Sequence, residues 1–221
     1  MSTTRLYLVR HGATRLTAED RFAGDVGVDL SEEGRWQAEL LGERLRRENL
    51  AAAYCSPLSR TIETANIIAP LCGVTPVAVE GLREIRHGRW EGLTRAEVEV
   101  RFGDEYTSWQ EDPFTFAPVG GESGVEVLAR ALPALRAIVT NHPGQRVLVV
   151  SHKATIRLLL SSVLGIDARG YRDRLDQAPA CLNVLDFRDP VHARLMLFND
   201  TSHYSAKPRV VTDSLSKWWD T

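Results

Sequence analysis

The chain has little cysteine, no long apolar run and no excess of charge of either sign. Its 221 residues include only 3 cysteines, too few and too scattered for a disulfide framework or a zinc site. No apolar run approaches the roughly 20 residues that a membrane-spanning helix needs. Lys and Arg together number 27 against 29 Asp and Glu, so net charge indicates neither a nucleic-acid nor a membrane partner.

Three sequence signals are also missing. Residues 1–4 lead directly into a predicted strand, without the apolar stretch of a signal peptide. No G-x-x-x-x-G-K-[ST] run is present, which excludes P-loop kinase chemistry. No basic patch alternates with aromatic residues, as nucleic-acid binding would require. We therefore expect a cytoplasmic protein that contacts neither membrane nor nucleic acid.

Short apolar runs alternate with segments of helical period. This pattern predicts an α/β fold, in which a mainly parallel sheet carries helices on both faces. Residues 193–198 should pair with the preceding strand as a hairpin at the sheet edge. The expected strands are residues 6–9, 51–55, 75–79, 146–150, 181–187 and 193–198.

Two helices have clear start signals. Ser31 is a predicted N-cap for a helix that reaches residue 47. Pro57, at a first helical position, predicts a helix through residue 69. The predicted apolar stripe of the first helix consists of Trp36, Leu40, Leu41 and Leu45.

We expect residues 1–221 to form a single domain, because no linker or repeat interrupts the pattern. Within it, residues 85–121 are predicted to make a helical and loop excursion that covers the active-site edge of the sheet. Its aromatic residues should mainly pack together, with some of them walling the pocket. Residues 207–221 form a polar tail that ends near Trp218 and Trp219, a pair that could either cover an apolar surface or meet a second copy in a homodimer.

Chemically useful side chains follow four of the predicted strands. In parallel α/β sheets, ligands bind just beyond the carboxyl ends of the strands, so residues far apart in sequence should meet there. The sequence therefore predicts one site at this edge. Its members, in chain order, are Arg10 and His11, Ser56 and Arg60, Glu84, and His152.

These residue types suit phosphoryl transfer. The guanidinium groups of Arg10 and Arg60 can each offer a planar fork to phosphate oxygens. A neutral imidazole at His11 can attack phosphorus and form a covalent intermediate. Positive charge nearby should lower the pKa of His11 and keep that ring neutral.

The ester oxygen that leaves needs a proton, for which Glu84 is the predicted donor. The same carboxylate could then activate water, while His152 stabilises charge on the phosphoryl group. Glu84 could alternatively serve as an ion-pair partner of Arg83 or Arg86. His87 lies three residues after Glu84, and we interpret it as pocket lining or surface rather than as a metal ligand.

A set of motifs in fixed order gives the sequence a family resemblance over about residues 5–160. The first motif is Arg10-His11-Gly12, at the end of the first strand. The others are Arg21-Phe22-Ala23-Gly24, Asp29-Leu30-Ser31-Glu32-Glu33-Gly34, Ser56-Pro57-Leu58-Ser59-Arg60-Thr61, Leu82-Arg83-Glu84-Ile85, Gly88-Arg89-Trp90-Glu91-Gly92, Gly120-Gly121-Glu122-Ser123 and Val150-Ser151-His152. This ordered set resembles the histidine phosphatase superfamily, also called phosphoglycerate mutase-like.

The resemblance implies a phosphohistidine on His11, Glu84 as proton donor, and no metal or cofactor. It also implies a phosphate pocket formed by Arg10, Arg60 and His152. Other positions on the substrate side of the motifs are Thr17, Ala23, Gly24 and Lys153.

Three of those positions depart from the family pattern. Thr17 stands where an Asn is common, and Ala23 replaces a usual Gln. Lys153 follows the second histidine, where Gly is common. Its ammonium group could contact a second anionic group on the substrate or simply face solvent.

We expect hydrolysis of a small phosphorylated metabolite, a phosphomonoesterase activity. A phosphoglycerate mutase is the alternative within the same fold, although such mutases usually carry a longer insertion after the Glu-bearing segment. A binding domain without catalysis is the third hypothesis.

Overall fold

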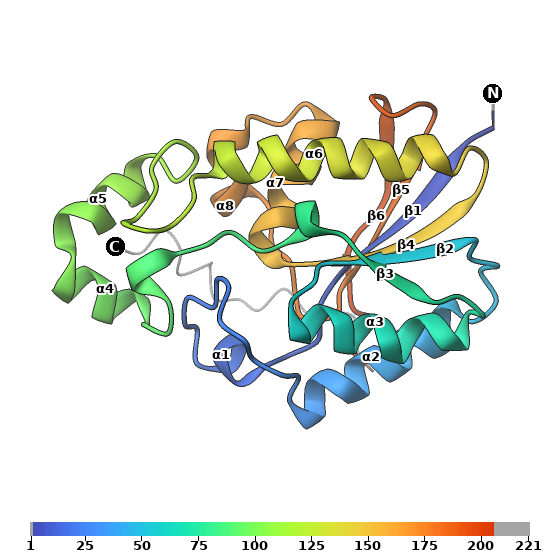
Figure 1. Ribbon diagram of the computed structural model, residues 1–221, viewed down its shortest axis with the longest axis horizontal. Coiled ribbons are helices and arrows are strands. Elements are labelled where there is room, and N and C mark those ends of the chain that lie inside the picture. The colour runs from blue at the N-terminus through green and yellow to red at the C-terminus, as the bar shows by residue number, and fades with distance from the viewer. Residues whose placement is uncertain (1, 206–221) are drawn as a thin grey trace.

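The computed structural model describes residues 2–205, and its centre is a six-stranded sheet in the order β3-β2-β4-β1-β5-β6 (Figure 1). Strands β1 to β4 run parallel, whereas β5 and β6 are antiparallel and form the predicted edge hairpin. The predicted α/β class is confirmed, with a mixed sheet. The strands are β1 (Thr4–Arg10), β2 (Ala52–Cys55), β3 (Pro76–Ala78), β4 (Arg146–Ser151), β5 (Leu182–Phe187) and β6 (Ala193–Asp200).

Helices connect and cover these strands. The α-helices are α1 (Arg15–Ala18), α2 (Glu32–Leu45), α3 (Ser59–Leu71), α4 (Arg95–Arg101), α5 (Gly103–Glu111), α6 (Gly124–Asn141), α7 (Lys153–Leu164) and α8 (Tyr171–Arg174). Three short 3₁₀ turns are η1 (Glu80–Leu82), η2 (Gly88–Trp90) and η3 (Ala168–Gly170). The predicted tail, with Trp218 and Trp219, lies outside the described residues.

The sheet separates two apolar cores because successive strand residues point to opposite faces. Tyr7 and Val9 of β1 pack with α2 and α3 on one face. Leu6 and Leu8 pack with α6 and α7 on the other. In Figure 1, α6 lies above the sheet and α2 and α3 lie below it. This sandwich holds the carboxyl ends of the parallel strands in fixed register.

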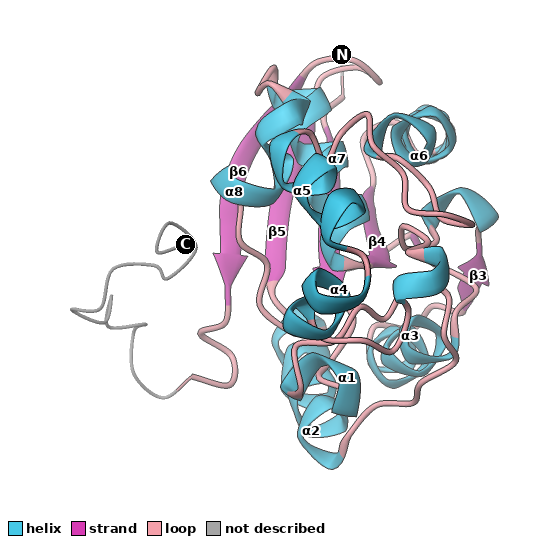
Figure 2. Ribbon diagram, turned by 90° about the vertical axis from the view of Figure 1, so that its left-hand side faces the viewer, coloured by secondary structure: helices cyan, strands magenta, loops and turns pink. Residues whose placement is uncertain are grey.

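The predicted excursion lies beyond those carboxyl ends. Figure 2 views the molecule from that side, with α4 and α5 in front of the sheet. Trp90, Tyr106 and Trp109 are buried there in an aromatic cluster with Phe22, which comes from the loop after α1. Packing is therefore the main role of these aromatic residues, as the sequence predicted.

Two details of the predicted helices are wrong. Helix α2 buries the face that carries Ala38, Leu41 and Leu45, and Trp36 lies off that face with 48% of its surface exposed. Helix α3 begins at Ser59 rather than at Pro57, because Leu58 still has an extended backbone (φ −76°, ψ 142°) and serves as the N-cap. The capping residue Ser31 is where the sequence predicted it.

Candidate active site

The segment Arg10-His11-Gly12 leaves β1 at the centre of the sheet. The amide of His11 donates to the carbonyl of Ser151 at 3.0 Å, which continues the pairing of β1 with β4 by one residue. Gly12 then passes very close to the main chain of Gly34 in α2. A Cβ at position 12 would lie 2.4 Å from the carbonyl oxygen of Gly34, so no larger residue fits without displacing the backbone. The close approach of α2 thus requires a glycine directly after His11.

The hydrogen bonding of His11 defines its tautomer. Its Nδ1 lies 2.8 Å from the carbonyl oxygen of Gly12. Because a carbonyl can only accept, Nδ1 carries the hydrogen and Nε2 of the neutral ring keeps the lone pair. Burial, followed by the charges of Arg60 and Arg10, holds the pKa of His11 well below its usual value. The ring is therefore neutral at pH 7, and burial contributes more than the positive charge that the sequence suggested.

Arg10 and Arg60 are both buried beside His11. Nη1 of Arg10 donates to the carbonyl of Gln177 at 2.7 Å, while its Nε is buried without a partner among the described residues. Nη2 of Arg60 donates to the carbonyl of Gly24 at 2.8 Å. Two fixed positive charges thus accompany one neutral imidazole, which suits an anionic ligand.

His152 lies next to His11, with 5.3 Å between the ring centroids. Its Nδ1 accepts from Nε of Arg60 at 3.2 Å, so its Nε2 carries the hydrogen that Oγ of Ser56 accepts at 2.7 Å. Burial, followed by the charge of Arg60, holds the pKa of His152 well below its usual value. Both ring nitrogens are thus engaged, and His152 lies beneath the cavity wall rather than on it.

Glu84 lies just after η1 and is buried against the first turn of α7. Its carboxylate accepts from the amides of Ile85 at 3.0 Å and Thr155 at 3.2 Å, and the hydroxyl of Thr155 also donates to it at 3.2 Å. The alternative ion pair with Arg83 or Arg86 is not formed: Arg83 pairs with Asp25, and Arg86 lies against Glu122.

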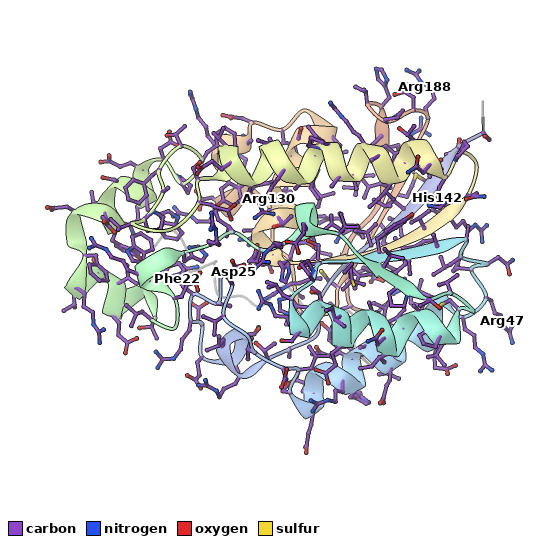
Figure 3. All side chains as sticks on the ribbon, in the orientation of Figure 1. Phe22, Asp25, Arg47, Arg130, His142 and Arg188 are labelled. Carbon is purple, nitrogen blue, oxygen red and sulfur yellow. The ribbon has the colours of Figure 1, made fainter. Side chains whose placement is uncertain are left out.

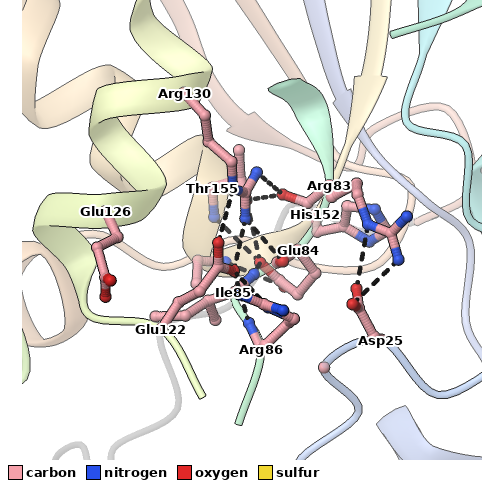
Figure 4. A network of polar contacts seen from close by, with 12 residues as sticks. Asp25, Arg83, Glu84, Ile85, Arg86, Glu122, Glu126, Arg130, His152 and Thr155 are labelled. Carbon is pink, nitrogen blue, oxygen red and sulfur yellow. Dashed lines mark hydrogen bonds and ion pairs between the residues drawn. The ribbon is translucent and has the colours of Figure 1, made fainter. Parts of the chain in front are cut away.

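Arg130 and its partner Glu122 hold the backbone segment that carries Glu84 (Figure 4). Arg130 of α6 donates to the carbonyls of Arg83 and Glu84, each at 2.9 Å. Glu122 accepts from Arg130 at 2.9 Å and from the amide of Arg86 at 3.1 Å. Burial opposes ionisation of Glu122, but the bonds and charge of Arg130 outweigh it and lower the pKa of Glu122. In Figure 3, Arg130 lies near the middle of the molecule, unlike the peripheral Arg188.

A cavity of about 170 Å³ opens above these residues. All four predicted substrate-side residues, Thr17, Ala23, Gly24 and Lys153, line it beside the catalytic candidates Arg10, His11, Arg60 and Glu84. His87 lines it too, as expected.

Local structure explains the placement of two of these residues, Thr17 and Gly24. Thr17, in the short helix α1, has its hydroxyl 3.0 Å from that of Thr14, whose side chain caps the helix. Gly24 has a φ of +45°, which favours glycine, and a Cβ there would overlap the side chain of Glu91. His87 has a buried Nδ1 with no partner among residues 2–205, and burial lowers its pKa to about 4.

Sequence reasoning missed several residues of the site. Gln177 holds Arg10 through its carbonyl, and nothing in its surroundings in the sequence marks it. Thr155 could have been found, since it lies three residues beyond the predicted site residue His152. Arg157 lines the cavity one turn after Lys153, a spacing that was visible in the sequence. Within residues 2–205, no cluster of three or more His, Cys, Asp or Glu side chains could hold a metal ion.

Comparison with known proteins gives this geometry a family. The model of the histidine phosphatase superfamily (branch 1) matches residues 6–201. The chain belongs to this superfamily. Phosphoserine phosphatase 1 of Hydrogenobacter thermophilus is 36% identical over 163 residues, which are 74% of this chain and 77% of that protein. Glucosyl-3-phosphoglycerate phosphatase of Mycolicibacterium vanbaalenii is 33% identical over 75% of this chain and 76% of its own length.

Solved structures of histidine phosphatase relatives share the fold. The structure titled Bacillus stearothermophilus YhfR superposes with a TM-score of 0.84 at 32% identity, covering 90% of this chain and 98% of that one. Some other curated relatives are longer, and the chain spans 55% of their length. No helix in the described part of this histidine phosphatase is long and apolar enough to cross a membrane.

Proposed function

We propose that this histidine phosphatase is a phosphomonoesterase that forms a phosphohistidine on Nε2 of His11. The state of His11 carries the proposal, because its ring is neutral, its Nδ1–H is held by the carbonyl of Gly12, and its Nε2 keeps a lone pair. Arg10 and Arg60 supply the charge that a phosphate needs beside that nucleophile.

The reaction would proceed in two displacements. Nε2 of His11 bonds to phosphorus as the P–O ester bond breaks, and Glu84 gives its proton to the leaving oxygen. Glu84 then takes a proton from water, whose oxygen attacks phosphorus as the P–N bond breaks. Inorganic phosphate leaves, and His11 returns to its neutral state with Glu84 protonated again.

The neighbouring residues would bind and position the phosphoryl group. Arg10 and Arg60 would bind its oxygens, with Thr17, Ala23 and Gly24 around them. His152 would act by positioning Arg60. The hydrogen bond that Nδ1 of His152 accepts from the guanidinium of Arg60 supports this role. No metal or cofactor is needed for these steps.

The substrate would be a small phosphorylated metabolite. The size of the cavity supports this, as do relatives named phosphoserine phosphatase and glucosyl-3-phosphoglycerate phosphatase. We also propose that the chain works as a single domain and is cytoplasmic, which its three free cysteines support. A homodimer is a further proposal, supported by the exposed Met196 and Phe198 on edge strand β6 and testable by light scattering.

The direct test is phosphate release from an aryl phosphate and from 3-phosphoglycerate, each with and without a chelator. We expect release of inorganic phosphate that survives chelation. Exclusive conversion of 3-phosphoglycerate to its isomer would instead establish a mutase, and binding of both esters without turnover would establish a silent binding domain. Loss of activity on chelation, restored by a divalent metal, would contradict the metal-free scheme.

A further inference from the structure

The cavity extends past the phosphate residues to two cations on helix α7. Lys153 and Arg157 both line it, and their spacing of four residues places them on one face of the helix. Lys153 directly follows His152 in the chain, and Arg157 lies four residues further on. Neither is used by the steps proposed for phosphoryl transfer.

Arg157 is built into the cavity wall rather than extended into solvent. Only 5% of its surface is exposed. Its Nε is buried and has no hydrogen-bond partner among the described residues. A buried guanidinium donor without an acceptor is costly, so a ligand that supplies an oxygen there would gain free energy.

The carboxylate of Asp176 pairs with both cations. Oδ1 of Asp176 lies 3.3 Å from Nη2 of Arg157 and 3.7 Å from Nζ of Lys153, and the side chain of Asp176 is 57% exposed. The two cations thus share one carboxylate that is itself more than half exposed, so a further monovalent carboxylate can pair with them beside Asp176.

We infer that Lys153 and Arg157 form a subsite for a carboxylate on the organic part of the substrate. This inference rests on the proposed phosphatase function and narrows the substrate to a small phosphorylated hydroxy or amino acid. The phosphate lies against Arg10 and Arg60, and the carboxylate lies against α7. Specificity then comes from the distance between the two anionic groups.

The electrostatics of Lys153 agree with this arrangement. Burial, followed by the charges of Arg157 and Arg10, lowers the pKa of Lys153 to about 8, against the opposing charges of Asp176 and Asp20. The ammonium group is thus held in a positive and partly dry environment. A bound carboxylate relieves that repulsion.

Matched pairs of substrates test the subsite. O-phosphoserine carries a carboxylate that O-phosphoethanolamine lacks, and 2-phosphoglycolate carries a carboxylate where ethyl phosphate carries a methyl group. The wild type should prefer the carboxylate-bearing member of each pair in kcat/KM. In Lys153→Gln, and also in Arg157→Gln, this preference should fall about tenfold or more, mainly through KM, since each variant removes a charge-assisted contact.

Arg136→Gln is the matched control, because it removes one positive charge from an exposed position on α6. Its substrate preference should equal that of the wild type. Lys153→Gln is the primary variant, since its side chain is more exposed than that of Arg157 and its loss threatens the fold less.

Several outcomes would overturn the inference. One is an equal loss on both members of each pair, and another is an unchanged preference in Lys153→Gln. A preference for ethylene glycol bisphosphate over 2-phosphoglycolate would assign the subsite to phosphate instead. If no ester is hydrolysed, the phosphatase proposal fails separately, and calorimetric binding of 2-phosphoglycolate against ethyl phosphate still tests the subsite.

Discussion

The carbonyl of Gly12 determines which nitrogen of His11 carries a hydrogen. That single acceptor makes Nε2 the basic nitrogen, and burial keeps the ring neutral. Arg60 has a comparable effect on His152, whose Nδ1 can only accept from the guanidinium. The two neighbouring histidines thus carry their hydrogens on different ring nitrogens, although the sequence presents both simply as strand-end residues.

At the scale of single residues, Glu84→Gln tests the proposed proton donor. The amide keeps the shape of the side chain but cannot transfer a proton. We expect turnover of alkyl phosphates, which have poor leaving groups, to fall by roughly 10²-fold or more. Turnover of 4-nitrophenyl phosphate, whose leaving group needs no proton, should fall much less. Steady-state kinetics over a series of leaving groups would measure the difference, and equal slowing of all esters would point to another acid.

Helix α6 contributes to the site through Arg130, which binds the carbonyls of the segment that carries Glu84. Arg130→Gln should lower stability by about 1–3 kcal/mol, because it leaves partly buried acceptors unsatisfied. It should also reproduce the leaving-group dependence of Glu84→Gln in weaker form, since Glu84 would lose its fixed position. Chemical denaturation and the same kinetic series would measure both effects.

Arg136→Gln on the same helix is the control for Arg130, and should change stability by less than about 0.5 kcal/mol. Reduced stability of Arg130→Gln with an unchanged leaving-group dependence would show that Arg130 supports only the fold.

At the scale of elements, periodicity and capping residues predicted most of what is observed. Ser31 was predicted correctly because its side chain and the amide that it accepts from lie three residues apart, a purely local relation. Trp36 was misplaced because its exposure depends on which face of α2 meets the sheet. Pro57 was misplaced because the turn after β2 takes two more residues than the sequence suggests.

The site residues that follow strand ends could be predicted from the sequence. Those that reach the site only through tertiary packing could not. Arg10, His11 and Arg60 follow strands, and the parallel sheet brings them together. Gln177 and Arg130 contact the site from elements distant in sequence, through main-chain carbonyls that have no sequence signature.

The molecule as a whole should lose stability as pH falls below about 6.5. His11 and His152 are buried with lowered pKa values, so the unfolded chain binds protons that the folded chain does not. Stability from these groups is fully present above the unfolded pKa and decreases as pH falls below it. Each contributes a slope of up to about 1.4 kcal/mol per pH unit.

Denaturant unfolding at pH 7, 6 and 5 would measure this slope. His11→Ala should show a shallower dependence than the wild type, because it removes one of the buried histidines whose pKa is lowered in the folded state. A free energy of unfolding that stays constant or rises toward pH 5 would contradict the neutral state of these histidines.

The central claim is a covalent phosphoryl group on His11, and rapid quenching during turnover of a radiolabelled phosphate ester tests it most directly. The wild type should carry label that is lost in acid and stable in base, as a phosphoramidate bond requires, and a tryptic peptide containing His11 should hold it. His11→Ala, shown to be folded by circular dichroism, should carry none. Equal labelling of His11→Ala, or acid-stable label on another residue, would contradict the account.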